Sequence, residues 1–145
     1  MKPRHLPLRI FLAAFGLVIF WLGLDIAFGG IRTLGWMGPT DFLDVADPGP
    51  FNVQDNHVRF LGGVWCAIGL AYVLGAALFA RMKTTLLVLC GLIFVGGLSR
   101  FTGPEFTTLF NFSVLPSFLI ELIGMPLLAF WIFRSSTAET IPVQQ

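Results

Sequence analysis

The chain has 145 residues, enough for one compact domain, and 56% of them are apolar while only 12% are charged. Soluble domains usually carry about twice that share of charged residues, so the composition indicates an integral membrane protein whose main partner is the lipid bilayer. The formal net charge is +1. Because no stripe of basic residues alternates with aromatic ones, a nucleic-acid-binding protein is excluded.

Four apolar stretches approach or exceed the roughly 20 helical residues that cross a bilayer core. They predict an all-α integral membrane protein, a four-transmembrane-helix bundle forming a single membrane domain over residues 1–145. The long connection at residues 29–57 is rich in Gly, Pro and Asp and is expected to be an outer loop, in which Thr40 is a candidate cap for a short interfacial helix. The helices are predicted at about 8–28, 58–80, 83–101 and 114–134.

The distribution of basic residues predicts the orientation of these helices. Short basic loops stay on the cytoplasmic side of a membrane. We therefore expect both the N and the C terminus to be cytoplasmic, and the segment at 106–112 to be re-entrant or interfacial on the outer side. The basic side collects Lys2, Arg4, Arg9, Arg81, Lys83 and Arg134.

Sequence motifs for catalysis or metal binding are absent. Cys66 and Cys90 lie inside apolar runs, with no Cys-x-x-Cys or Cys/His spacing, and are expected to be buried packing residues. Neither a Ser/His/Asp set nor a phosphate-binding loop occurs. We therefore predict no catalytic residue, no cofactor and no metal.

The charged residues within or beside the helices are the candidates for a site, because ionisable groups in a bilayer are costly. Heights can be counted along each helix from its inner end at 1.5 Å per residue. On this count Asp25 lies about 24 Å, Arg100 about 25 Å and Glu121 about 20 Å above the inner end of its helix. The side chain of Arg59, about 33 Å up, is long enough to reach down to them. The predicted outer-half polar cluster consists of Asp25, Asn56, Arg59, Arg100 and Glu121.

Small residues and one proline accompany this cluster. Small side chains let membrane helices approach closely. Pro126 cannot donate a hydrogen bond to the carbonyl of Leu122, so we expect a kink one turn below Glu121, with room for a small hydrated pocket. The residues predicted to shape helix packing are Gly62, Gly63, Gly69, Gly96, Gly97 and Pro126.

Three segments carry a resemblance to a known family. They are Asp-Asn-His-Val-Arg-Phe-Leu-Gly-Gly at 55–63, Gly-Gly-Leu-Ser-Arg-Phe at 96–101 and Glu-Leu-Ile-Gly-Met-Pro at 121–126. With them the chain resembles a bacterial family of small four-helix membrane proteins catalogued as domain of unknown function 4345. The aromatic run 106–112 departs from that family, whose members often have a small-residue step there. The resemblance implies a four-helix bundle in the bacterial inner (plasma) membrane and implies no activity.

Three hypotheses on function remain open. The first is an accessory or scaffolding component of a membrane complex, whose partners are other membrane-protein subunits or further copies of itself. The second is a binder or transporter of a small amphipathic or anionic molecule, held by the arginines of the polar cluster. The third is a lipid- or quinone-modifying enzyme with Glu121 as a proton carrier. The lack of a catalytic set favours the first, in which the cluster has a structural role.

Overall fold

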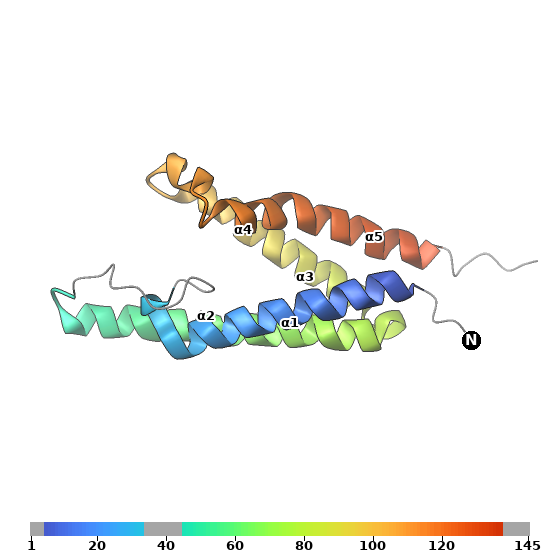
Figure 1. Ribbon diagram of the computed structural model, residues 1–145, viewed down its shortest axis with the longest axis horizontal. Helices are drawn as coiled ribbons and strands as arrows, with labels where there is room; N and C mark the ends of the chain where they lie inside the picture. The colour runs from blue at the N-terminus through green and yellow to red at the C-terminus, as the bar shows by residue number, and fades with distance from the viewer. Residues whose placement is uncertain (1–4, 34–44, 138–145) are drawn as a thin grey trace, which may run out of the picture. The chain divides into compact units, whose positions relative to one another are not determined.

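The computed structural model describes residues 5–33 and 45–137, and every regular element in these two ranges is a helix (Figure 1). Four helical segments are long and apolar enough to cross a membrane. The prediction of an all-α chain with four such helices is confirmed, while membrane insertion and the side on which the termini lie stay predictions. The segments are Leu6–Arg32, Pro48–Ala77, Phe79–Thr102 and Leu115–Ser135.

The chain divides into two compact units. The N-terminal unit, Arg9–Leu78, contains most of α1 (Leu6–Gly29), the 3-10 turn η1 (Gly30–Arg32) and α2 (Pro48–Ala77). The C-terminal unit comprises Met1–Leu8 and Phe79–Gln145. Its elements after the start of α1 are α3 (Phe79–Ser99), η3 (Arg100–Thr102), η4 (Phe106–Phe110), α4 (Leu115–Leu119), η5 (Ile120–Gly124) and α5 (Met125–Thr137).

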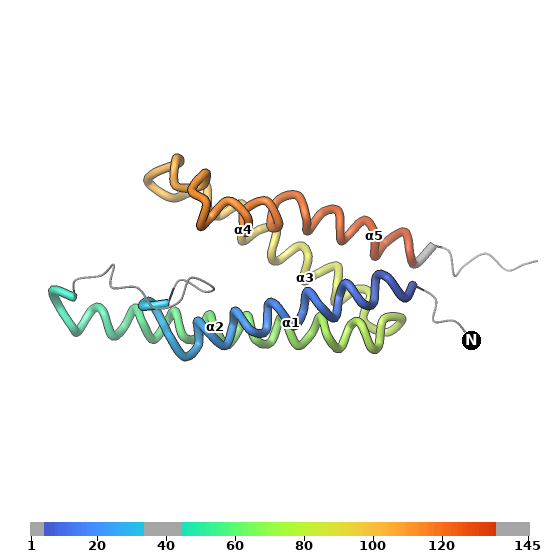
Figure 2. Tube along the Cα trace, in the orientation of Figure 1, coloured from blue at the N-terminus to red at the C-terminus, as the bar shows by residue number. Residues whose placement is uncertain are grey.

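In the N-terminal unit, α1 and α2 run side by side in opposite directions, and glycines set the distance between them (Figure 2). A β-carbon at Gly16 would lie 2.7 Å from the carbonyl oxygen of Gly69, and one at Gly23 would lie 2.9 Å from that of Gly62. The two glycines of each helix are separated by two helical turns, so they share one face. The backbones therefore touch directly, as small residues allow in membrane helices.

Two glycines that were expected to pack helices make no close contact within their own units. Gly63 and Gly96 are exposed, and a β-carbon at either would meet no described atom within 4 Å. Each stands beside a buried glycine, Gly62 or Gly97. One residue turns a helix by about 100°, which carries the neighbouring position away from the contact. A packing role for these two positions outside their own units stays a prediction.

The helix α2 begins at Pro48, well before the predicted start near residue 58. The side chain of Asp47 accepts a hydrogen bond from the backbone N–H of Gly49 at 2.9 Å, and Pro48 occupies the first helical position. An Asp cap followed by Pro is a strong helix start, which the Gly/Pro-rich composition of the segment concealed. The predicted outer loop is correspondingly shorter, and Thr40 lies outside the described residues.

Only Leu78 separates α2 from α3. The third helix was expected to begin at residue 83, but it begins at Phe79. The backbone angles of Leu78, φ −107° and ψ 38°, are not helical. The connection was expected at Arg81, Met82 and Lys83, but these residue types favour helices, and they belong to α3. The ammonium group of Lys83 lies 5.6 Å from the ring centroid of Phe79, one turn earlier on α3.

In the C-terminal unit, α3 packs against the last helical segment, α4 to α5, through residues that alternate three and four apart. This spacing is typical of an apolar seam between two helices. Glu121 occupies one seam position among apolar residues and is the buried charged residue of the described chain. Of the two cysteines, Cys90 is buried in the seam, whereas Cys66 in α2 is half-buried. The seam contains Leu86, Cys90, Ile93 and Gly97 on α3, and Phe118, Glu121, Met125, Leu128 and Ile132 on the last segment.

Candidate functional site

An ion pair between Arg100 and Glu121 joins the end of α3 to the last helical segment. Nε of Arg100 donates to Oε2 of Glu121 and Nη2 donates to Oε1, both at 2.6 Å. The Glu121 side chain is 10% exposed and that of Arg100 is 36% exposed. Two parallel hydrogen bonds between a planar guanidinium and a carboxylate fix both direction and distance. The pair is therefore a neutral, oriented link between two helices.

A helical irregularity carries Glu121. Residues Ile120–Gly124 form a single π-helical turn, η5, in which the N–H of Met125 donates to the carbonyl of Ile120. Pro126, which lacks an N–H, follows directly. The sequence predicted a kink here, and the structure has a π turn at this place. Such turns often accompany functional positions because they redirect side chains.

Two small residues complete the surroundings of the ion pair. A β-carbon at Gly97 would lie 2.8 Å from the β-carbon of Glu121, so only glycine leaves room for this carboxylate. The hydroxyl of Ser117 lies 3.4 Å from Nη2 of Arg100 as an acceptor, and donates to the carbonyl of Val114 at 2.8 Å. The hydroxyl thereby extends the network by one helical turn.

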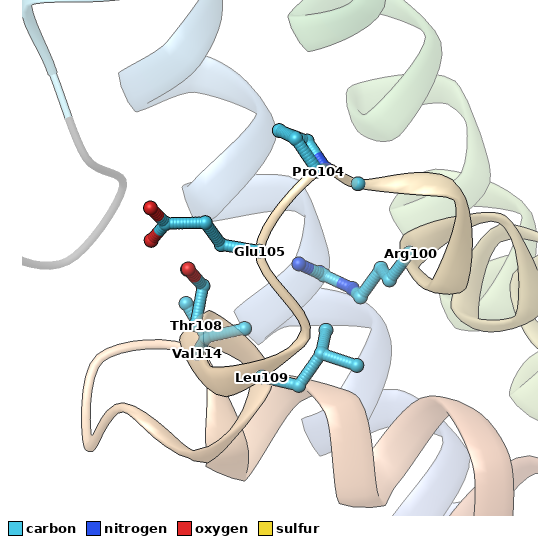
Figure 3. Close-up of a pocket in the computed structure, with 7 residues that line it drawn as sticks. Arg100, Pro104, Glu105, Thr108, Leu109 and Val114 are labelled. Carbon is cyan, nitrogen blue, oxygen red and sulfur yellow. The ribbon is translucent and has the colours of Figure 1, made fainter.

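A pocket of about 350 Å³ lies beside the guanidinium of Arg100 (Figure 3). In Figure 3 the side chain of Arg100 extends toward the loop that carries Pro104 and Glu105, and Leu109 lies below it in this view. The carboxylate of Glu105 points away from Arg100. Leu109 is buried, whereas Glu105 and Thr108 are exposed. The accessible lining of the pocket is mostly apolar, with polar groups at its rim. Residues that line it include Arg100, Pro104, Glu105, Thr108, Leu109 and Val114.

In the N-terminal unit, Arg59 pairs with Asp55, one turn earlier on α2. Nε of Arg59 donates to Oδ2 of Asp55 at 2.6 Å, while Oδ1 accepts the backbone N–H of Ile31 at 2.8 Å. Gly30 turns the chain beneath this carboxylate with φ +64°, a conformation that favours glycine. A β-carbon at Gly30 would also collide with Asp55. Asp55 therefore fastens η1 to α2.

Each helix of the N-terminal unit supplies an arginine to the carboxyl end of the other. Nη1 of Arg59 donates to the carbonyls of Phe28 and Ala27 at 2.5 and 3.3 Å. Arg9, near the start of α1, donates to the carbonyls of residues 76 and 77 at 2.6 and 2.9 Å. The last carbonyls of a helix lack partners within it and favour a nearby cation. The two arginines satisfy these groups reciprocally.

The remaining predicted site residues lie in the N-terminal unit. Asp25 is half-buried on α1 and accepts a hydrogen bond from the hydroxyl of Thr33 at 2.6 Å. Asn56 is exposed on α2. The structure thus brings Arg100 to Glu121, but gives Arg59 and Asp25 partners outside the predicted set. The grouping of all five residues in one cluster stays a prediction.

Sequence reasoning missed several residues that take part in these networks. Asp55 and Arg59 are four residues apart on one helix, as are Ser117 and Glu121, and side chains at that spacing are neighbours. This signal was available for Ser117 and Glu121, but not for Asp55 and Arg59, because Asp55 was assigned to the predicted loop at 29–57. Thr33 has no comparable signal, because its contact with Asp25 depends on the turn of η1.

Comparison with known proteins identifies one family. The family model described as "Domain of unknown function (DUF4345)" matches residues 7–132 of the chain. No curated protein and no solved structure matches the chain.

Proposed function

The chain belongs to the DUF4345 family, and we propose that it is a multi-pass protein of the bacterial inner membrane with an accessory or scaffolding role in a membrane complex. The four apolar helical segments support its insertion into a bilayer. The clustering of basic residues at the termini and in the short connection between α2 and α3 supports cytoplasmic ends.

The engagement of both candidate arginines by their own unit is the observation that carries this proposal. Arg59 is used by a carboxylate and two helix-terminal carbonyls, and Arg100 by a bidentate carboxylate. The bonds from Arg59 to carbonyls of α1 and the pair of Arg100 with Glu121 each link two helical segments. Loss of Arg100 would leave the largely buried charge of Glu121 without a partner. This use of the charges favours a structural role of the two arginines over a catalytic one.

The outward-facing surface supports association within the membrane. Large apolar side chains project from the helices, with Trp21 70% exposed and Phe28 79% exposed. In a bilayer these faces contact either lipid or the helices of another protein. A small protein with internally satisfied charges and broad apolar outer faces is suited to pack against membrane-embedded partners.

Quantitative affinity purification tests the proposal. The full-length chain with a C-terminal tag is cross-linked in cells, extracted in mild detergent and purified beside an unrelated tagged four-helix membrane protein at matched abundance. We expect a specific membrane-embedded partner, or a second copy of the chain, at reproducible stoichiometry. Recovery of the chain as a monomer with no partner above the control would contradict the proposal.

Reporter fusions test the proposed orientation independently. A reporter that is fluorescent only in the cytoplasm is fused to either end of the full-length chain. Both fusions should fluoresce, because the basic residues near both ends favour retention on the cytoplasmic side. A dark fusion at either end, with normal protein abundance, would overturn the orientation.

A further inference from the structure

Arg100 keeps part of its hydrogen-bonding capacity beside the pocket. A guanidinium has five N–H donors. Those of Nε and Nη2 go to Glu121 and Ser117, whereas Nη1 donates to no acceptor within the described ranges. Since Arg100 lines the pocket, Nη1 can donate a hydrogen bond to an acceptor atom that enters the pocket.

The charges around the pocket argue against a simple anion as its occupant. Glu121 already neutralises Arg100, and Glu105 adds a second carboxylate at the rim. An anion that displaced Glu121 would leave this largely buried carboxylate without its partner, which is strongly unfavourable. A suitable occupant therefore brings an acceptor for Arg100 together with a positive group for Glu105. That combination is a zwitterion.

The size of the pocket limits which part of such a molecule it can hold. A volume of about 350 Å³ equals the space of roughly a dozen liquid waters. It fits a compact polar head group but not an acyl chain as well. Any apolar tail must therefore lie outside the pocket.

Exposed phenylalanines beside the pocket offer a surface for such tails. Phe101 stacks on Phe106 with 5.8 Å between ring centroids, and Phe106 meets Phe110 edge-on at 5.7 Å. All three rings are about half exposed or more. Aromatic rings are enriched at the depth of lipid head groups, which agrees with the predicted position of Arg100 at the outer end of α3.

We propose that the pocket beside Arg100 binds the head group of a zwitterionic phospholipid. A phosphate oxygen accepts from Nη1 of Arg100, and the ammonium group extends past the rim toward Glu105, whose exposed side chain rotates to meet it. The acyl chains lie against the phenylalanines of η3 and η4. This lipid site goes beyond the scaffolding role and depends only on the proposed insertion into the membrane.

Lipid selectivity tests the site. The full-length protein, first located in the membrane fraction, is purified in detergent and incubated with equal amounts of phosphatidylethanolamine, phosphatidylcholine and anionic phosphatidylglycerol. Native mass spectrometry measures the bound lipid. We expect either zwitterionic lipid to be retained over phosphatidylglycerol. Glu105→Gln should lower that preference by about two- to fivefold, the effect of losing a largely exposed ion pair, with an unchanged melting temperature because Glu105 is exposed.

Asp47→Asn provides the matched control. It removes one exposed carboxylate that does not line the pocket, and Asn preserves the helix cap. Its lipid preference should equal that of the unmodified protein. Retention of phosphatidylglycerol at or above the level of both zwitterionic lipids, or equal changes in Glu105→Gln and Asp47→Asn, would overturn the lipid site. A chain absent from the membrane fraction would instead overturn the proposed function.

Discussion

Gly97 and Glu121 face each other across the contact between α3 and the last helical segment, so closely that a β-carbon at residue 97 would stand 2.8 Å from that of Glu121. Arg100, the first residue of η3 directly after α3, donates two hydrogen bonds of 2.6 Å to this carboxylate. The missing side chain at residue 97 thus allows the acid to lie between the helices. The ion pair and the close approach of the helices depend on each other.

The substitution Gly97→Ala should lower the free energy of unfolding in detergent by about 1–3 kcal/mol, the usual cost of inserting a methyl group into a packed contact. Gly96→Ala is the matched control, since its β-carbon would meet no described atom within 4 Å. The control should unfold at the same temperature as the unmodified protein or slightly higher, because Ala favours a helix over Gly. Circular dichroism during heating measures both. Equal losses in the two variants would refute the packing described for Gly97.

The substitution Asp55→Ala should release the N–H of Ile31 and leave Arg59 without its carboxylate. Losing a hydrogen bond of this kind costs about 1–3 kcal/mol locally, so amides of η1 should exchange with deuterium roughly tenfold faster or more. Asp47→Ala serves as the comparison and should speed exchange only in the first turn of α2, near Gly49, where its side chain caps the helix. Unchanged exchange in η1 of the Asp55 variant would show that this carboxylate does not hold the turn.

Removal of the Arg9 side chain should weaken the carboxyl end of α2. Its guanidinium donates to the last two carbonyls of that helix, and a cation at this position contributes about 0.3–1 kcal/mol. Arg9→Ala should therefore lower the midpoint of thermal unfolding, and Arg9→Lys should restore part of it. Arg81→Ala removes an exposed basic residue predicted on the same side of the membrane and should change the midpoint less. A larger loss in the Arg81 variant would contradict the capping role.

Hydropathy and run length were sufficient to predict the four helices, because a bilayer demands apolar segments of a certain length. They could not place helix starts, which depend on single residues. Asp47 and Pro48 start α2 within a segment whose overall composition is typical of a loop. The break at Leu78 likewise has no marker in the residue type, since Leu is common inside helices.

The candidate site was predictable in part. The expectation that a charge in a bilayer needs a partner drew attention to Arg100 and Glu121, which the structure pairs with each other. Pro126 marked the irregular region, but one proline is compatible with either a kink or a π turn. The partners of Arg59 were missed because helix-terminal carbonyls are present in every sequence, and only the packing of α1 on α2 makes two of them available to an arginine.

A double-mutant cycle on Arg100 and Glu121 tests most directly whether these charges hold the helices together. Arg100→Met and Glu121→Met are made singly and together in the full-length protein, and the free energy of unfolding is measured in the same detergent. Each single variant should lose up to about 3 kcal/mol, because the remaining charge has no partner, while the double variant should lose much less than the two single losses combined. Losses that simply add would contradict a structural ion pair.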